Sequence, residues 1–356
     1  MSAASPRRCG DFRTSYRQEM TLFPSRRSLA GLLIGLAVLA CAPLFLKSYG
    51  LSLLIQIGYL GIAALGLNLV TGFTGQISLG HAAFFGFGAF ASAWLNNRYG
   101  VPVLLAIPLA GVATALVGLV FGAPAARIKG LYLAIATLAA QYILEDFFSR
   151  ATWFTGGAAG ATTNPVSIAG FQMNTDARYF YVVLFFVVVM YVYASNLMRT
   201  RDGRAMVAVR DHYLAAEIMG VQLTRYRVLS FGLASFYAGV AGALMGHYVG
   251  FVSTESINIL LSVQMLGMII IGGLGSVMGS LLGTVFMVLM PETIEALFHA
   301  LQQWAGKSAA ASAGLIYMKE IAIGLVIILF LVFEPDGLAH RWRQIKAYWK
   351  LYPFSY

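Results

Sequence analysis

Long apolar segments, separated by short polar or glycine-rich stretches, occupy most of the chain. Most of these segments approach the roughly 20 residues that an α-helix needs to cross about 30 Å of hydrocarbon. The pattern therefore predicts an all-α integral membrane protein with about ten transmembrane helices, some of them broken or re-entrant. The predicted spans are residues 29–46, 51–71, 82–95, 102–123, 131–148, 179–198, 228–250, 260–272, 276–291 and 317–333.

The composition also indicates a membrane protein, and it affects how the positive net charge is interpreted. Hydrophobic residues make up 59% of the chain and charged residues 11%, against about 25% charged in a typical soluble domain. A formal net charge of +10 would suggest nucleic acid as a partner of a soluble protein. Here the basic residues concentrate at the N-terminus, in residues 199–227 and in the C-terminal tail. We therefore expect no nucleic-acid partner and read the charge as a topology signal.

The basic clusters test the number of spans, because Lys and Arg near transmembrane helices mark the cytoplasmic side. Arg127 and Lys129 fall inside after four spans, and residues 199–227 fall inside after six. The basic tail falls inside only if residues 260–291 cross twice. Ten spans with both termini cytoplasmic satisfy every cluster, whereas nine would leave the tail outside.

This topology divides the chain into three parts. We expect a basic cytoplasmic N-terminus, a transmembrane domain with one large cytoplasmic loop and two external loops, and a basic cytoplasmic tail. The parts are residues 1–28, 29–338 and 339–356, with the cytoplasmic loop at 199–227 and the external loops at 149–178 and 292–316.

Polar residues and glycines interrupt the apolar pattern over residues 68–81. At membrane depth such a stretch must line a cavity or pack within protein, because lipid satisfies no backbone hydrogen bonds. Broken helices of this kind build substrate sites in transporters. The alternative is a cytoplasmic turn between the second and third spans. The candidates for a translocation pathway are Asn68, Thr71, Gln76, Ser78 and His81, together with Gln141 in the fifth span.

Six glycines are predicted to have structural roles at chain reversals. Three interrupt the polar stretch, and three form the turn on which the two passes of residues 260–291 depend. They are Gly72, Gly75, Gly80, Gly272, Gly273 and Gly275.

The cytoplasmic loop 199–227 contains a short helix signal. Asp211 can cap a helix over residues 212–219, and Gly220 supplies its stop. The spacing places Leu214, Ala215, Ile218 and Met219 on one face. Such a helix can lie on lipid or fill a groove in a soluble partner; the alternative is a solvated loop.

No sequence motif for catalysis, for a metal site or for a nucleotide-binding P-loop is present. The rival to a partner-driven transporter is a proton- or ion-coupled carrier, which should hold ionisable residues in mid-span. Glu145 and Asp146 lie near the end of the fifth span, with Arg150 close by. We expect an interfacial pair there, which disfavours the carrier.

Several motifs, in order, resemble the LivM-type permeases of branched-chain amino-acid ABC importers. The first and longest is GLNLVTGFTGQISLGHAAFFG over 66–86. The others are GLYLAIATLA over 130–139, TGG from Thr155, GRAMVAVRD over 203–211, Ala215-Ala216, Met219-Gly220-Val221, GGLGS over 272–276 and EPDGL over 334–338. Together they span about residues 50–340. Glu334 departs from the basic residue that the family usually carries there.

The resemblance implies an ABC importer permease fold in the bacterial inner membrane. It implies a LivH-type second permease, two ATPases of the LivG and LivF type that hold ATP and Mg²⁺, and a periplasmic binding protein; this chain itself would hold no cofactor. It also identifies Asp211 to Gly220, including Ala216, as the helix that docks in the ATPase, with Arg204 and Arg210 at its rim. Related permeases serve branched-chain amino acids, urea, amides or aromatic acids, and these alternatives stay open.

Overall fold

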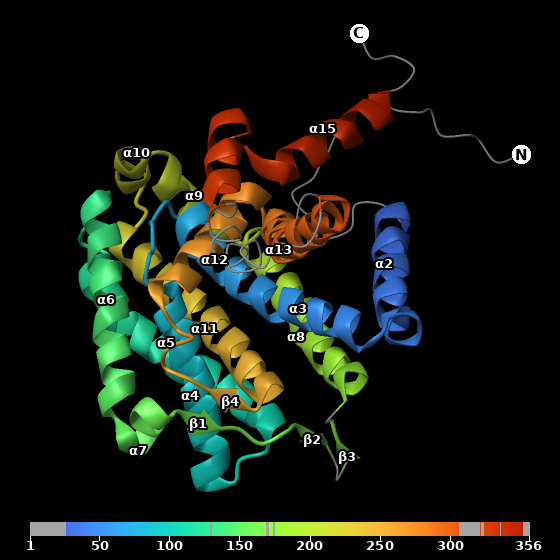
Figure 1. The fold of residues 1–356 in the computed structure, drawn as a ribbon. Helices are drawn as coiled ribbons and strands as arrows, with labels where there is room; N and C mark the ends of the chain where they lie inside the picture. The colour runs from blue at the N-terminus through green and yellow to red at the C-terminus, as the bar shows by residue number, and fades with distance from the viewer. Residues whose placement is uncertain are drawn as a thin grey trace, which may run out of the picture.

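The computed structural model describes residues 26–128, 130–168, 171–173, 175–305, 321, 324–334 and 336–351. Helices dominate it, and several of them cross the molecule from end to end (Figure 1). The α-helices are α2 (Arg26–Phe45), α3 (Ser48–Asn68), α4 (His81–Tyr99), α5 (Val103–Ala125), α6 (Leu131–Arg150), α7 (Thr152–Thr155), α8 (Asp176–Leu197), α9 (Arg201–Asp211), α10 (Tyr213–Ile218), α11 (Leu223–Val249), α12 (Ile259–Gly272), α13 (Val277–Ala305) and α15 (Gly337–Leu351).

Two helices form the centre of the molecule. α3 continues into a π-helix, η1 (Leu69–Phe73). Of the most apolar 18-residue stretch of this combined helix, 72% is buried. The same fraction holds for α11, whereas α5, α6, α8 and α13 bury only 33–39%. A membrane helix that is buried all round packs against other helices, whereas one that is buried on one side faces lipid or a partner. α3 and α11 are therefore the core around which the other helices pack.

Small residues let α4 approach α11 closely. A Cβ on Gly88 would lie 2.3 Å from the Cα of Gly239, and one on Gly242 would lie 1.8 Å from the backbone oxygen of Phe85. Glycine at such positions lets helix backbones touch, which is how membrane helices gain packing energy without a hydrophobic driving force.

The predicted count of ten spans is not confirmed. Among the described residues, six helices are long and apolar enough to cross a membrane: Ser48–Phe73, Val103–Ala125, Leu131–Arg150, Asp176–Leu197, Leu223–Val249 and Val277–Ala296. Three further apolar helices are shorter: Leu33–Phe45, Ile259–Gly272 and Gly324–Phe333. α4 is 19 residues long and ends in the polar sequence Asn96-Asn97-Arg98.

The predicted external segment 292–316 is not a separate helix at its start. α13 continues through Pro291 to Ala305, and residues 306–320 lie outside the described part of the chain. A membrane helix can continue through a proline, because neighbouring groups satisfy the backbone group that the proline frees. The sequence therefore placed a boundary where the helix runs on.

The prediction of a purely α-helical chain misses two small sheets. The loop after α6 carries a 3₁₀ turn, η2 (Gly157–Ala159), and three strands, β1 (Ala161–Thr162), β2 (Ser167–Ile168) and β3 (Phe171–Gln172). β2 pairs with β3, and β1 pairs with β4 (Phe251–Val252) after α11. Strands of two residues carry no alternating pattern, so the sequence does not reveal them.

The two ends of the molecule differ. α9, α10 and the start of α15 lie at one end, whereas α7 and the strands lie at the other (Figure 1). Arg227 donates a hydrogen bond to the backbone oxygen of Ala126 at 3.1 Å, which joins the loop after α5 to the start of α11. The basic residues 199–227 and the start of α15, both assigned to the cytoplasm from the sequence, thus lie at the same end (Figure 1).

Candidate functional site

The cytoplasmic loop predicted from sequence folds into two consecutive helices, and the first of them was missed. Thr200 caps α9, with its Oγ1 accepting a hydrogen bond from the Gly203 N–H at 3.3 Å. Met206 and Val209 are buried and hold α9 against the body of the protein. The Thr200 cap was the available sequence signal. α9 is therefore held in place by packing, and α10 follows it at the surface.

The predicted stop of the second helix is confirmed, and its predicted cap is wrong. Gly220 has a φ of 86°, its N–H bonds the Glu217 oxygen, and the Val221 N–H bonds the Ala216 oxygen, both at 2.9 Å. This is the Schellman arrangement. Asp211 instead ends α9, and its carboxylate binds Arg210 at 2.8 Å. A residue already in helical conformation is not placed to cap the next helix.

The apolar face predicted for this helix lies open at the surface. The side chains of Leu214, Ile218 and Met219, which we call the α10 ridge, are 53%, 85% and 84% exposed. Ala215 is also exposed, whereas Ala216 is buried toward α9 and α11. The ridge therefore has no packing partner within the described part of this chain.

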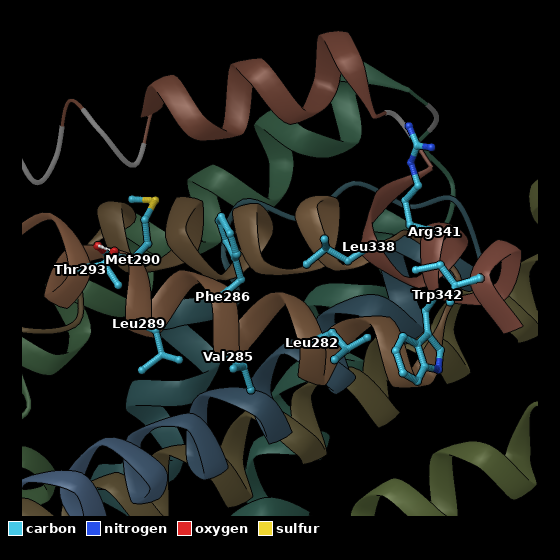
Figure 2. A pocket seen from close by; sticks show the side chains of 10 residues that line it. Leu282, Val285, Phe286, Leu289, Met290, Thr293, Leu338, Arg341 and Trp342 are labelled. Carbon is cyan, nitrogen blue, oxygen red and sulfur yellow. Dashed lines mark hydrogen bonds between the residues drawn. The ribbon is translucent and has the colours of Figure 1, made fainter.

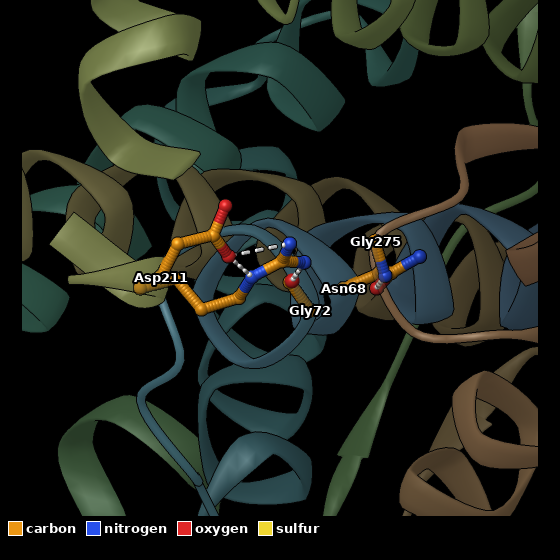
Figure 3. A network of polar contacts seen from close by, with 5 residues as sticks. Asn68, Gly72, Asp211 and Gly275 are labelled. Carbon is orange, nitrogen blue, oxygen red and sulfur yellow. Dashed lines mark hydrogen bonds and ion pairs between the residues drawn. The ribbon is translucent and has the colours of Figure 1, made fainter. Parts of the chain in front are cut away.

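The two arginines predicted for the rim of this helix lie differently. Arg204 is exposed, and its Nη1 donates to the backbone oxygen of Arg199 at 2.8 Å, within the same loop. The side chain of Arg210 is 36% exposed but turns toward η1, where its Nη1 donates to the Gly72 oxygen at 2.7 Å (Figure 3). Arg210 thus joins α9 to η1, 138 residues away in sequence.

The polar stretch that begins at Asn68 is a broken helix. η1 ends at Phe73, the chain turns at Gly75 with a φ of 70°, and α4 starts at His81. A Cβ on Gly80 would lie 2.2 Å from the Thr137 oxygen in α6. Thr137 is six residues into α6, or roughly 9 Å at 1.5 Å per residue. The start of α4 therefore lies beside the second turn of α6, inside the molecule and not at the surface that carries α9 and α10.

Side chains from other helices satisfy the backbone amides at the start of α4. The Leu79 N–H bonds Thr137 Oγ1 at 3.0 Å, the Ala82 N–H bonds Ser262 Oγ at 2.9 Å, and the Ala83 N–H bonds Gln141 Oε1 at 2.9 Å. The first amides of a helix need such partners away from water. Sequence reasoning missed Thr137 and Ser262, whose signal is a lone hydroxyl in an apolar segment.

All six predicted pathway residues are buried inside the chain. Asn68, Thr71, Gln76, Ser78, His81 and Gln141 are between 0% and 9% exposed. His81 Nε2 lies 3.0 Å from the Ala63 oxygen, and Gln141 Nε2 donates to Glu145 Oε1 at 2.8 Å. The stretch therefore packs within protein, and its role in a pathway stays a prediction.

Asn68 joins the broken helix to the turn between α12 and α13. Its Nδ2 donates to the Ser276 oxygen at 2.9 Å and to Ser280 Oγ at 2.7 Å. Its Oδ1 accepts from the Gly275 N–H at 2.9 Å, as Figure 3 shows. A Cβ on Gly72 would lie 1.7 Å from Asn68 Oδ1. Only a glycine at position 72 leaves room for this bridge.

The turn itself is the glycine reversal predicted from the sequence. Gly273 and Gly275 have φ values of 113° and 74°, which favour glycine, and a Cβ on Gly272 would lie 2.0 Å from the Gly279 oxygen. Arg210 Nη1 lies 2.7 Å from the position of a Cβ on Gly275. Arg210 therefore touches both η1 and this turn, and the helix that carries it leads directly into α10.

Comparison with known proteins places these features in a family. Residues 49–331 match the family model described as branched-chain amino acid transport system / permease component. The high-affinity branched-chain amino acid permease proteins LivM of Salmonella typhimurium and Escherichia coli are each 29% identical, over 310 and 342 residues. These matches cover 80% and 88% of this chain, and 69% and 76% of the relatives.

A related permease of a second type also matches. The probable branched-chain amino acid permease LivH of Methanocaldococcus jannaschii is 26% identical over 296 residues, which cover 80% of this chain and 90% of the relative. No solved structure matches the chain. Since the family model covers most of the sequence, including the broken helix, the α9–α10 loop and the α12–α13 turn, the chain belongs to the permease-component family of branched-chain amino acid transport systems.

Proposed function

We propose that this chain is the LivM-type subunit of an ABC importer for branched-chain amino acids. It works with a LivH-type permease, two ATPases that bind ATP and Mg²⁺, and a periplasmic binding protein. The observation that carries the proposal is the open α10 ridge, joined through α9 and Arg210 to the broken helix. The exposed apolar face of α10 can bind a partner, and the hydrogen bond from Arg210 to the Gly72 oxygen can carry a movement of that partner to the transmembrane helices.

The chemistry of α10 fits a groove in a soluble partner. Leu214 and Ile218 project from a helix of six residues and Met219 from its C-cap, and the preceding helix anchors α10 to the membrane domain. Apolar anchors in a pocket supply most of the energy of a protein interface. Arginines surround the ridge in the sequence, and charges at a rim set orientation and association rate. They are Arg199, Arg201, Arg204 and Arg225.

In the proposed mechanism, ATP binding closes the two ATPases and moves α10. Because Arg210 lies in the last turn of α9 and donates a hydrogen bond to the Gly72 oxygen, the movement reaches η1. The hydrogen bonds of Asn68 then couple the movement of α3 to the turn between α12 and α13. The two permease subunits then rock apart on the outer side, which is a shift between two arrangements of packed helices.

The solute pathway lies between the two permease subunits, and the binding protein sets most of the selectivity. Glu145 accepts a hydrogen bond from Gln141, and Asp146 pairs with Arg150 at 2.8 Å on the exposed face of α6. Neither carboxylate is placed as a proton relay or as a site for a free ammonium group. Tight binding of leucine by the purified permease alone would contradict this view.

The proposed location is the bacterial inner membrane, with both termini in the cytoplasm. The support is that α9, α10 and the start of α15 lie at one end (Figure 1), where residues 199–227 hold six arginines and α15 holds four Lys or Arg. The excess of Lys and Arg marks the cytoplasmic side.

Changing Leu214 and Ile218 to Asp tests this function. We expect the double variant to lose its ATPases, because each buried anchor contributes about 2 kcal/mol or more, or roughly 30-fold in affinity. The measurement is the amount of ATPase that co-purifies with the permease from cells that express the whole transporter.

The matched control places two aspartates on exposed apolar residues at the opposite end, Val249→Asp/Phe251→Asp. This control should retain the ATPases. Equal retention by both variants, each still eluting as a folded protein, would mean that α10 is not the docking helix.

A further inference from the structure

An apolar groove of about 480 Å³ follows α13 and ends beneath the start of α15 (Figure 2). Its floor is a row of α13 side chains from Leu282 through Val285 and Leu289 to Thr293. Arg341 and Trp342 of α15 lie at the Leu282 end of the groove, opposite Thr293 (Figure 2). One end of the groove is therefore charged and aromatic, and the rest is hydrocarbon.

α15 has the composition of a helix that lies at a membrane surface. Residues 341–348 are exposed, with Trp342, Ile345 and Tyr348 at intervals of three. Arg343 and Lys346 belong to the other side of the helix, and the sequence of α15 contains no acidic residue. Basic amphipathic helices with aromatic residues bind in the headgroup region, and their Lys and Arg residues attract anionic lipid.

The dimensions of the groove match one lipid tail. From Leu282 to Thr293 the helix rises eleven residues, or roughly 16 Å at 1.5 Å per residue. This is about half of the ~30 Å hydrocarbon core, which is the depth of one leaflet. We propose that the groove between α13 and α15 binds an anionic phospholipid, with an acyl chain along α13 and the phosphate at the Arg341 end of the groove, where Arg343 and Lys346 on the other side of α15 add positive charge.

Glu334 holds the side chain of Arg341 in place at the charged end of the groove. Arg341 Nε lies 2.5 Å from Glu334 Oε1, and Nη2 donates to Oε2 at 2.6 Å. The guanidinium holds the pKa of Glu334 below its usual value, so this carboxylate is ionised at neutral pH. The pair balances one charge and orients Arg341 over the groove, while Arg343 and Lys346 supply the net positive charge that distinguishes anionic from zwitterionic lipid.

Native mass spectrometry of the purified full-length chain tests the site. Phosphatidylglycerol and phosphatidylcholine with the same acyl chains are titrated separately, and the lipid that stays bound is measured. We expect one phosphatidylglycerol to bind more tightly than phosphatidylcholine. Arg343→Gln/Lys346→Gln should weaken phosphatidylglycerol roughly 30-fold, at about one tenfold step for every 1.4 kcal/mol and about 1 kcal/mol per charge, and leave phosphatidylcholine unchanged.

Val285→Trp fills the groove and should displace the lipid, whereas Val120→Trp, on an exposed face of α5, should retain it. Equal binding of the two lipids, or equal retention by the two tryptophan variants, would overturn the proposal. The assembled transporter should keep the lipid. Its loss on assembly would overturn the proposal too, because the groove would then be a contact with the second permease. None of these measurements depends on ATPase binding.

Discussion

Replacing Arg210 with alanine is expected to abolish most ATP-driven transport while the ATPases stay bound. The α10 ridge is intact in this variant, so docking should persist. The hydrogen bond from Arg210 to the Gly72 oxygen is lost, and with it the direct polar link between α9 and η1. Coupling between distant sites is typically worth about 5- to 150-fold, so we expect transport per ATP hydrolysed to fall by about that range in reconstituted vesicles.

Arg98→Ala is the matched control, because Arg98 is exposed in the last turn of α4, away from α9 and α10. It should transport nearly as well as the unchanged protein. Arg210→Lys should give an intermediate rate, since an ammonium group lacks the fork that contacts Gly72 and Asp211 together. If Arg210→Ala instead releases the ATPases, Arg210 is a rim contact of the docking helix and not an internal link.

Gly242→Ala is expected to destabilise the folded protein more than any other substitution proposed for this chain. The new Cβ would lie 1.8 Å from the backbone oxygen of Phe85, so α4 and α11 would have to separate. Overpacking in a well-packed core costs about 1–3 kcal/mol and sometimes more, and contact with backbone, which has no alternative rotamer, places this change at the upper end. Thermal unfolding of the purified protein in detergent, followed by intrinsic fluorescence, measures the change in midpoint.

Gly35→Ala is the control for the same exchange, because no atom lies within 4 Å of a Cβ at that position in α2. Its midpoint should match that of the unchanged protein. Similar shifts for the two variants would contradict the close approach of α4 and α11.

Much of the helical framework could be predicted because membrane helices carry a strong signal. The apolar runs located the long spans, and the glycine-rich polar stretch after Asn68 located the break before α4. The stop at Gly220 was also predicted, because a positive φ at a helix end favours glycine locally. These features depend on residues that are close in the sequence.

What the sequence did not reveal depends on residues that are far apart. α9 is a polar segment anchored by Met206 and Val209, and two buried large apolar side chains make a weak periodic pattern. The direction of Arg210 is set by an oxygen in η1, and the pairing of β1 with β4 joins positions 161 and 252. The burial of Gln141 likewise depends on α4 starting beside it.

ATP-dependent uptake of a radiolabelled branched-chain amino acid tests the central claim most directly. Proteoliposomes would contain this chain, its LivH-type partner and the two ATPases, with the binding protein and labelled leucine on the side opposite ATP. The account predicts uptake that requires ATP, the ATPases and the binding protein together, and that Leu214→Asp/Ile218→Asp abolishes. Uptake by this chain alone, driven by a proton or ion gradient without ATPases, would contradict it.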